Sequence, residues 1–352
     1  MDYVACLKTG LNDVKALINL EENRKKKIAP LLELRGKETD KHFSNFLSGW
    51  GEHTFFLDFS QNEPNNKDSA WLNELLCCDN EFEKKQELFD KYSNRKNMIP
   101  VISWQEDDNI RDIVQFALKT ERKFEEIALR VNANNEKAWI YLNILVSSIN
   151  NLSNTTIIFD FQTSPPAIPD EAVAFLHKIS KLSEYGIKQF VLLSTSFPTE
   201  KPRSGNTDYV SCTDYYWQKY IADRHKGSKI IYGDYAATNP FSVMEYVPGM
   251  IVIPFACYFT PFEWWMSRDG EDKEYIVFRE IAKEIISLPI FQGKDYCWAT
   301  REIAKIAELT PDIEGQHGTN GTWNGFKSNQ HMCTILEYLT HPPTAQTDED
   351  EE

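Results

Sequence analysis

Short apolar runs alternate with amphipathic segments along most of the chain. Eight of these runs have the length and composition of strands, and several are almost continuously hydrophobic, as strands covered on both faces must be. In chain order they are Tyr3–Leu7, Ile28–Leu34, Thr54–Phe59, Met98–Trp104, Glu126–Val131, Thr155–Phe161, Gln189–Leu193 and Lys229–Tyr232. Between them apolar residues recur at helical spacing, for example at Ile110, Ile113, Val114 and Ala117. The pattern therefore predicts eight consecutive βα units.

Eight such units favour an α/β protein with a (β/α)8 TIM-like barrel over residues 1–240. The strand starts are spaced by about 32 residues on average, which suits one strand and one helical connection. An open doubly wound sheet is built from the same units. However, no Gly-rich phosphate-binding fingerprint follows the first strand, so we expect the closed barrel.

The region 241–340 lies beyond the eighth predicted strand. Met250–Phe259 and Phe262–Ser267, separated by Thr260-Pro261, predict an aromatic-rich hairpin. Helical patterns follow at Tyr275–Leu288, Ala299–Leu309 and Asn329–Leu339, with a Gly-rich loop over 314–325 before the last of them. We expect this appended hairpin and helical cap to pack on one end of the barrel. Residues 341–352 are expected to form a disordered acidic tail.

Composition narrows the classes of function. The chain has 352 residues and a formal net charge of -15, from 53 acidic and 38 basic residues. Such a surface repels phosphate backbones, so an extended nucleic-acid-binding surface is not expected. There is no basic leader and no apolar run of about 18 residues, so we expect no membrane span. The seven cysteines are scattered, which favours reduced thiols and a cytoplasmic protein.

Charged residues gather where the predicted barrel strands end, which is where barrels of this type carry their chemistry. Glu33, Asp58, Asp160 and Asp234 are the candidate catalytic carboxylates. The candidate substrate-binding residues are Lys8, Arg35, Arg130, Ser196, Tyr235 and His331, the last reaching over the mouth from the appended region. Two interpretations stay open. The carboxylates supply acid–base catalysis or hold a divalent metal ion while the cations bind an anionic substrate, or the charges pair with each other as a structural plug.

Short motifs spread along the chain resemble those of the phage-type "beta protein" family. They are Ile28-Ala29-Pro30-Leu31-Leu32-Glu33-Leu34, Ile99-Pro100-Val101-Ile102, Ile158-Phe159-Asp160, Ser196-Phe197-Pro198, Tyr232-Gly233-Asp234-Tyr235, and Gly321-Thr322-Trp323-Asn324-Gly325 leading to Gln330-His331. The resemblance implies a role in conflict between phages and their hosts, but no particular chemistry. Thr195 stands where the family pattern has Gly, and Asn324 where it has a basic residue. If that basic residue binds an anion, this chain binds it less well.

Two functions remain open at this point. One is a hydrolase or binding protein for an anionic small molecule, such as a phosphodiester or a nucleotide. The other is a non-catalytic sensor or interaction protein that uses the barrel as a scaffold, with the appended region or the acidic tail engaging a protein partner.

Overall fold

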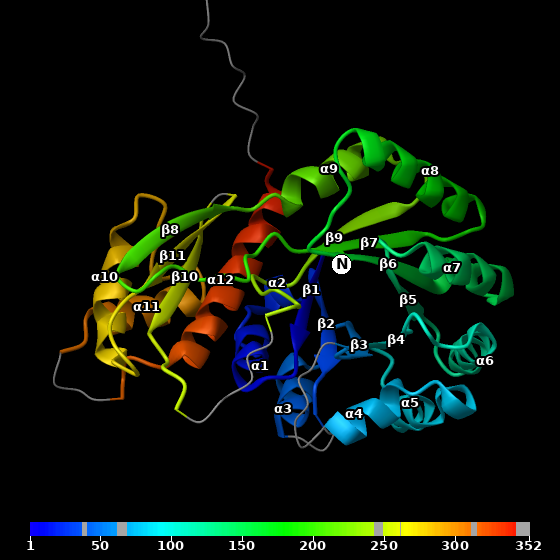
Figure 1. The fold of residues 1–352 in the computed structure, drawn as a ribbon, viewed down its shortest axis with the longest axis horizontal. Coiled ribbons are helices and arrows are strands. Elements are labelled where there is room, and N and C mark those ends of the chain that lie inside the picture. Colours follow the sequence, from blue (N-terminus) through cyan, green and yellow to red (C-terminus); the bar gives the residue numbers. More distant parts are fainter. Residues whose placement is uncertain (37–40, 62–68, 243–248, 261, 311–314, 343–352) are drawn as a thin grey trace, which may run out of the picture.

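Eight parallel strands close into a barrel, which confirms the predicted TIM-like fold (Figure 1). The computed structural model describes residues 1–36, 41–61, 69–242, 249–260, 262–310 and 315–342. The barrel strands are β1 (Tyr3–Lys8), β2 (Ile28–Leu34), β3 (Phe55–Phe59), β4 (Met98–Ser103), β5 (Ile127–Asn132), β6 (Thr155–Gln162), β7 (Gln189–Ser194) and β9 (Lys229–Asp234). Each strand pairs with the next, and β9 closes the barrel by pairing with β1 from Tyr3 to Ala5.

Helices connect successive strands and lie outside the barrel (Figure 1). They are α1 (Leu11–Ile18), α2 (Glu22–Lys25), α3 (Lys41–Trp50), α4 (Ser69–Leu76), α5 (Asp79–Lys91), α6 (Ile110–Glu121), α7 (Glu136–Ser148), the 3-10 turn η1 (Leu152–Asn154), α8 (Asp170–Glu184) and α9 (Asp214–Arg224). Among the described residues, no helix is long and apolar enough to cross a membrane.

The side chains of each barrel strand alternate between two cores, because successive residues of a strand point to opposite faces. On β1, Tyr3, Ala5 and Leu7 face outward and join the large core shared with the helices. Val4 and Cys6 face inward and join a separate apolar layer inside the barrel. The inward positions nearer the carboxyl ends of the strands are polar, and they form the floor of the barrel mouth.

A second, antiparallel sheet of three strands lies beside the barrel (Figure 1). Its strands β10 (Phe255–Thr260) and β11 (Glu263–Arg268) form the predicted hairpin, which is confirmed. Its third strand, β8 (Asn206–Ser211), pairs with β11 and was not expected. Five of the six residues of β8 are exposed, so its sequence lacks the apolar alternation that marks a strand.

The remaining elements are η2 (Tyr275–Val277), α10 (Phe278–Ser287), α11 (Trp298–Ala307) and α12 (Asn320–Thr340). The last helix begins nine residues before the predicted start at Asn329, within the predicted Gly-rich loop. Its glycines serve close packing: a Cβ at Gly321 would lie 2.7 Å from the Asn12 side chain, and one at Gly325 would lie 3.0 Å from the Asn12 carbonyl oxygen. The glycines therefore let α12 approach α1 closely.

Helix α12 packs against β1 on the outer wall of the barrel and against β10 of the small sheet (Figure 1), and its His331 contacts Asp234 of β9. Near its end, Thr340 lines a cavity together with Asp2 and Lys229, which lie at the amino ends of the strands. Its beginning lies toward the mouth, so it runs antiparallel to the strands, as the other barrel helices do. The appended region is thus placed against the side of the barrel, where α12 completes the wall. Of the predicted tail, 341–352, all but the first two residues lie outside the described residues.

Candidate functional site at the barrel mouth

Arg130, on β5, is the centre of a buried polar network at the mouth of the barrel. Its Nη1 donates to Glu33 Oε1 at 2.7 Å and to Asp58 Oδ2 at 3.0 Å. Its Nε and Nη2 donate to Asp160 Oδ2 at 3.0 and 2.8 Å, and Nη2 also lies 3.2 Å from the Tyr235 hydroxyl. These contacts occupy all five N–H donors of a guanidinium. Arg130 therefore joins residues from β2, β3 and β6 to the segment that follows β9.

The members of this network are almost inaccessible to water. Exposed fractions are 0% for Asp58, 5% for Asp160, 6% for Glu33 and 8% for Arg130. Burial opposes the charged form of Arg130, but attraction by Asp160 and Glu33 outweighs it and raises the pKa of the guanidinium. Arg130 thus keeps its charge at any physiological pH.

A second cation, Lys85, reaches the network from α5. Its ammonium group donates to Ser103 Oγ at 2.9 Å and lies 3.7 Å from Asp58 Oδ1, and Ser103 Oγ donates to the same Asp58 oxygen at 2.6 Å. Burial lowers the pKa of Lys85, against attraction by Asp58. Two cations therefore face three carboxylates, and the network formally holds one excess negative charge.

Tyr235 completes the floor. Its hydroxyl group donates to the Asp160 carboxylate, with contacts of 2.7 and 2.8 Å to the two oxygens. Burial, followed by the charge of Asp160, raises the pKa of Tyr235, so the phenol stays protonated and remains a donor. Tyr235 and Asp160 thereby connect the two sides of the mouth.

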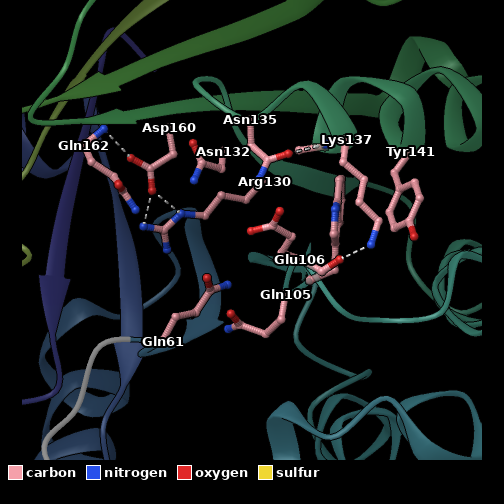
Figure 2. Close-up of a pocket in the computed structure, with 12 residues that line it drawn as sticks. Gln61, Gln105, Glu106, Arg130, Asn132, Asn135, Lys137, Tyr141, Asp160 and Gln162 are labelled. Atoms are coloured by element: carbon pink, nitrogen blue, oxygen red, sulfur yellow. Dashed lines mark hydrogen bonds and ion pairs between the residues drawn. The ribbon is translucent and has the colours of Figure 1, made fainter.

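Two cavities open above this floor. The first, of about 190 Å³, is lined by Arg130 and Asp160 together with polar side chains around the ends of β3 to β6 (Figure 2). Its carboxamides are Gln61, Gln105, Asn132, Asn135 and Gln162, and its aromatic residues are Trp104 and Tyr141. These amides follow predicted strands within one to four residues, so the sequence does mark them, although none of them was among the candidates.

The second cavity, of about 220 Å³, is lined by Glu33 and Tyr235 on its floor and by Lys8 and Arg35. Lys8 and Glu33 occupy paired positions on β1 and β2. Asp13 of α1 also lines the cavity. Burial raises the pKa of Asp13, opposed by the nearby charges of Arg35, Lys327 and Lys8. The structure therefore brings Lys8, Arg35, Glu33 and Tyr235 together, as the sequence predicts.

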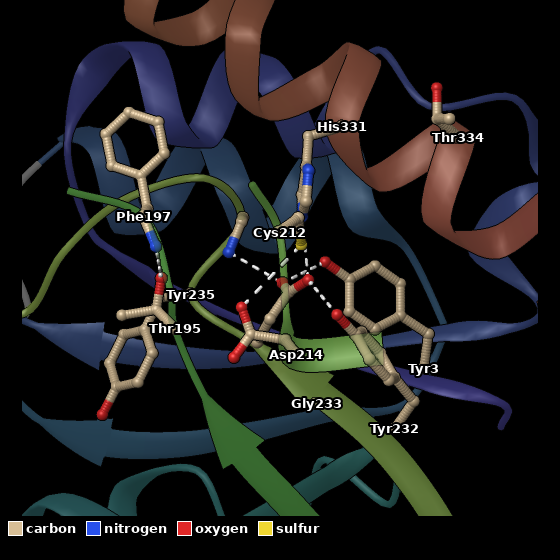
Figure 3. A network of polar contacts seen from close by, with 12 residues as sticks. Tyr3, Thr195, Phe197, Cys212, Asp214, Tyr232, Gly233, Tyr235, His331 and Thr334 are labelled. Atoms are coloured by element: carbon tan, nitrogen blue, oxygen red, sulfur yellow. Dashed lines mark hydrogen bonds and ion pairs between the residues drawn. The ribbon is translucent and has the colours of Figure 1, made fainter. Parts of the chain in front are cut away.

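Asp234 does not join the other three carboxylates. It lies on the outer face of β9, where its carboxylate accepts hydrogen bonds from the hydroxyls of Tyr3 and Tyr232, and from the Ala236 amide at 2.8 Å. His331 Nε2 of α12 lies 2.8 Å from its Oδ2. Figure 3 shows the side chains of Tyr3, Tyr232 and His331 in this network. Asp234 and His331 thus connect the barrel wall to α12 and do not reach the mouth.

Ser196 also has structural partners. Its amide and hydroxyl donate to Asp214 Oδ2 at 2.7 and 2.6 Å, and its hydroxyl accepts the Thr213 amide at 3.0 Å. Burial raises the pKa of Asp214, although hydrogen bonds from Ser194 and Ser196 oppose this. Neither of the two cavities at the mouth is lined by Ser196.

Within the described part of the chain, no three His, Cys, Asp or Glu side chains are grouped so that they could hold a metal ion. Three of the four carboxylates proposed from sequence, Glu33, Asp58 and Asp160, share Arg130 instead. All seven cysteines are free thiols.

Comparison with known proteins shows similarity to one protein family. A model of a family described as Beta protein matches residues 3–337. Protein beta of Enterobacteria phage P4 is 26% identical over 354 residues, which cover 95% of this chain and 93% of the phage protein. The matched span includes the whole barrel and the whole of the small sheet.

Proposed function

The chain belongs to the Beta protein family, as its motifs predict, and we propose that its barrel mouth binds a small anionic molecule such as a nucleotide or a phosphodiester. The observation that carries this proposal is the placement of Lys8 and Arg35 on one cavity, directly above the buried network. Cations at the carboxyl ends of barrel strands are well placed to hold a phosphate.

Local charge supports an anionic ligand although the whole chain is acidic. The cavity wall carries the two cations Lys8 and Arg35, and burial favours the neutral form of Asp13 on the same wall. An acidic surface around a cationic cavity disfavours long phosphate backbones but admits a small anion. The proposed partner is therefore a small molecule and not an extended nucleic acid.

In this proposal Arg130 holds the site and does not clamp the ligand. Its five donors already meet Glu33, Asp58, Asp160 and Tyr235. A floor tied together across the barrel keeps Glu33 and Tyr235 in fixed positions beneath the ligand, which is the preorganisation that binding sites need.

Hydrolysis of the bound anion is the catalytic form of the proposal. Glu33 is the carboxylate suited to it, because it lies on the floor of the Lys8–Arg35 cavity and can exchange a proton with a ligand there. A non-catalytic sensor is the second candidate. It is favoured by the engagement of all three mouth carboxylates with Arg130, the arrangement of a structural network.

For the biological setting, we propose a cytoplasmic protein that acts in conflict between a phage and its host. The similarity to a phage P4 protein and the free state of all seven cysteines support this setting. Plaque counts on bacteria that express the wild type or the Arg35→Gln variant test it. Equal plaque counts with the wild type and with an empty vector would contradict a defence role.

Calorimetric titration of the full chain with pyrophosphate, ribose 5-phosphate and bis(4-nitrophenyl) phosphate tests binding, and the last probe also reports hydrolysis by colour. We expect Lys8→Gln and Arg35→Gln each to weaken binding at least tenfold. Lys305→Gln, which removes an exposed lysine on α11, should leave it unchanged. If neither mouth variant changes the affinity for any probe, the proposal is wrong. Colour release by the wild type that is lost in Glu33→Gln favours the hydrolase, and binding without colour release favours the sensor.

A further inference from the structure

We propose, resting on the function proposed above, that the cavity over Arg130 and Asp160 is a nucleobase subsite. The ligand is then a nucleotide whose phosphate lies between Lys8 and Arg35. Three glutamines that follow barrel strands, Gln61, Gln105 and Gln162, present their amide groups to this cavity (Figure 2).

Within the described part of the chain, the side chains of these glutamines have no hydrogen-bond partner. The side-chain amides of Gln61, Gln105 and Gln162 make no hydrogen bond to any residue that the structure describes; the bonds of Gln105 and Gln162 to Asp108 and Asp160 come from their backbone amides. The two asparagines differ, because Asn132 closes a turn and Asn135 caps α7. Structural roles account for the asparagines but not for the glutamines.

The side-chain amide of Gln162 is held in place by a backbone conformation that is unfavourable for a residue other than glycine. Gln162 has a φ of 53°, in the left-handed region, where β6 changes register between Asp160 and Gln162. The backbone amide of Gln162 donates to Asp160 Oδ1 at 2.9 Å, and its backbone carbonyl oxygen accepts a hydrogen bond from the Thr195 amide at 2.7 Å. Bulges of this kind redirect a side chain next to a binding site.

The chemistry of the lining suits a flat ring with polar edges. A carboxamide offers a donor and an acceptor in one plane, which matches the paired donors and acceptors on the edge of a nucleobase. Trp104 and Tyr141 add aromatic surface on which a base can stack. A phosphate needs neither feature, so this lining points to the neutral part of the ligand.

The two cavities fit two parts of one molecule. Each is smaller than the range of about 300–1,000 Å³ that is usual for ligand pockets, whereas the two together fall within it. They also share a floor, because Asp160 in one cavity accepts the Tyr235 hydroxyl of the other. A ligand with an anionic end and a flat polar end would occupy both.

The test is a calorimetric comparison of AMP, GMP, CMP and UMP with ribose 5-phosphate, using the full chain. We expect at least one nucleotide to bind tenfold or more tightly than ribose 5-phosphate. Gln61→Ala and Gln105→Ala should each weaken its binding about threefold to tenfold, one neutral hydrogen bond each, without changing the affinity for ribose 5-phosphate. Gln115→Ala, on α6 and away from both cavities, is the matched control and should change neither affinity.

The outcomes separate this inference from the proposed function. If all four nucleotides bind as weakly as ribose 5-phosphate and the Gln61→Ala/Gln105→Ala double variant changes nothing, the nucleobase subsite is wrong. Loss of ribose 5-phosphate binding in Arg35→Gln would still uphold the anion site. If adenosine binds as tightly as AMP, through the glutamines, and Lys8→Gln has no effect, the anion site is wrong and the subsite stands. Failure of every probe to bind overturns both.

Discussion

Replacing Arg130 by methionine should destabilise the barrel strongly, because the guanidinium is the cation shared by Glu33, Asp58 and Asp160. The substitution would leave three carboxylates, each no more than 6% exposed, with only Lys85 to compensate them. Breaking a buried ion pair by removal of one partner costs roughly 3–5 kcal/mol. That is a large share of the total stability of about 5–15 kcal/mol that is usual for a folded protein.

The energies of the individual hydrogen bonds of Arg130 cannot be summed to give a cost above this range of roughly 3–5 kcal/mol. Five contacts to charged or polar partners would sum to about as much as the whole stability if each counted about 1.5–3 kcal/mol, but contacts within one network are not additive. We therefore expect the value for a single broken buried pair. Arg130→Lys should fall between the wild type and Arg130→Met, because a lysine restores the charge but cannot bridge the same set of acceptors with a planar fork.

Urea unfolding followed by circular dichroism measures these free energies. Lys305→Met is the control, since Lys305 is 62% exposed and its loss should change stability by no more than about 0.5 kcal/mol. A variant as stable as Lys305→Met at pH 7 would refute the central role of Arg130.

Three further substitutions test other parts of the structure by the same unfolding assay. Asp234→Asn should cost roughly 2–4 kcal/mol by disrupting its buried hydrogen bonds, whereas Asp223→Asn, at a site 54% exposed, should change little. Burial lowers the pKa of Lys327 from 10.5 to about 8, so Lys327→Met should stabilise the protein at pH 7 by up to about 3 kcal/mol. This advantage should decline between pH 8 and 10.5, where the native state has released the Lys327 proton and the unfolded state has not; a constant advantage would contradict it. Gly233→Ala should cost about 1–3 kcal/mol, because its Cβ would lie 2.7 Å from the Leu192 carbonyl oxygen; unchanged stability would show that the strand shifts freely.

The barrel could be predicted from sequence because its strands are covered on both faces. Strands such as Ile28–Leu34 have every residue buried and read as continuous apolar runs. Strand β8 gave no such signal, since it is a largely exposed edge strand, and its one partner among the described strands, β11, lies more than fifty residues away. The start of α12 was missed because Gly321 and Gly325 suggest a loop until the close approach of Asn12 is known. Strand β8 and the start of α12 both depend on contacts with residues distant in sequence, which local patterns do not reveal.

Part of the site could also have been predicted more sharply from strand alternation alone. Tyr232 and Asp234 share one face of β9, and Gly233 and Tyr235 lie on the other. Because Tyr235 directly follows Asp234, only one of the two can point into the barrel. From the sequence both residues are expected at the mouth, and the structure puts Tyr235 there and Asp234 outside.

The ion pairs inside the mouth could not be predicted in this way, because strand alternation gives the direction of a side chain but not its partner. Glu33, Asp58 and Asp160 all point inward, and any of the cations near them could have neutralised any one of them. Arg130 pairs with all three carboxylates because the five donors of its planar guanidinium point toward several strands at once. Pairing between β3 and β4 ends at Leu57 and Pro100, and the Lys85 side chain reaches Asp58 from α5 beyond that point. No local sequence pattern predicts this contact. Lys8 and Arg35 line the wall of the second cavity, beside Glu33.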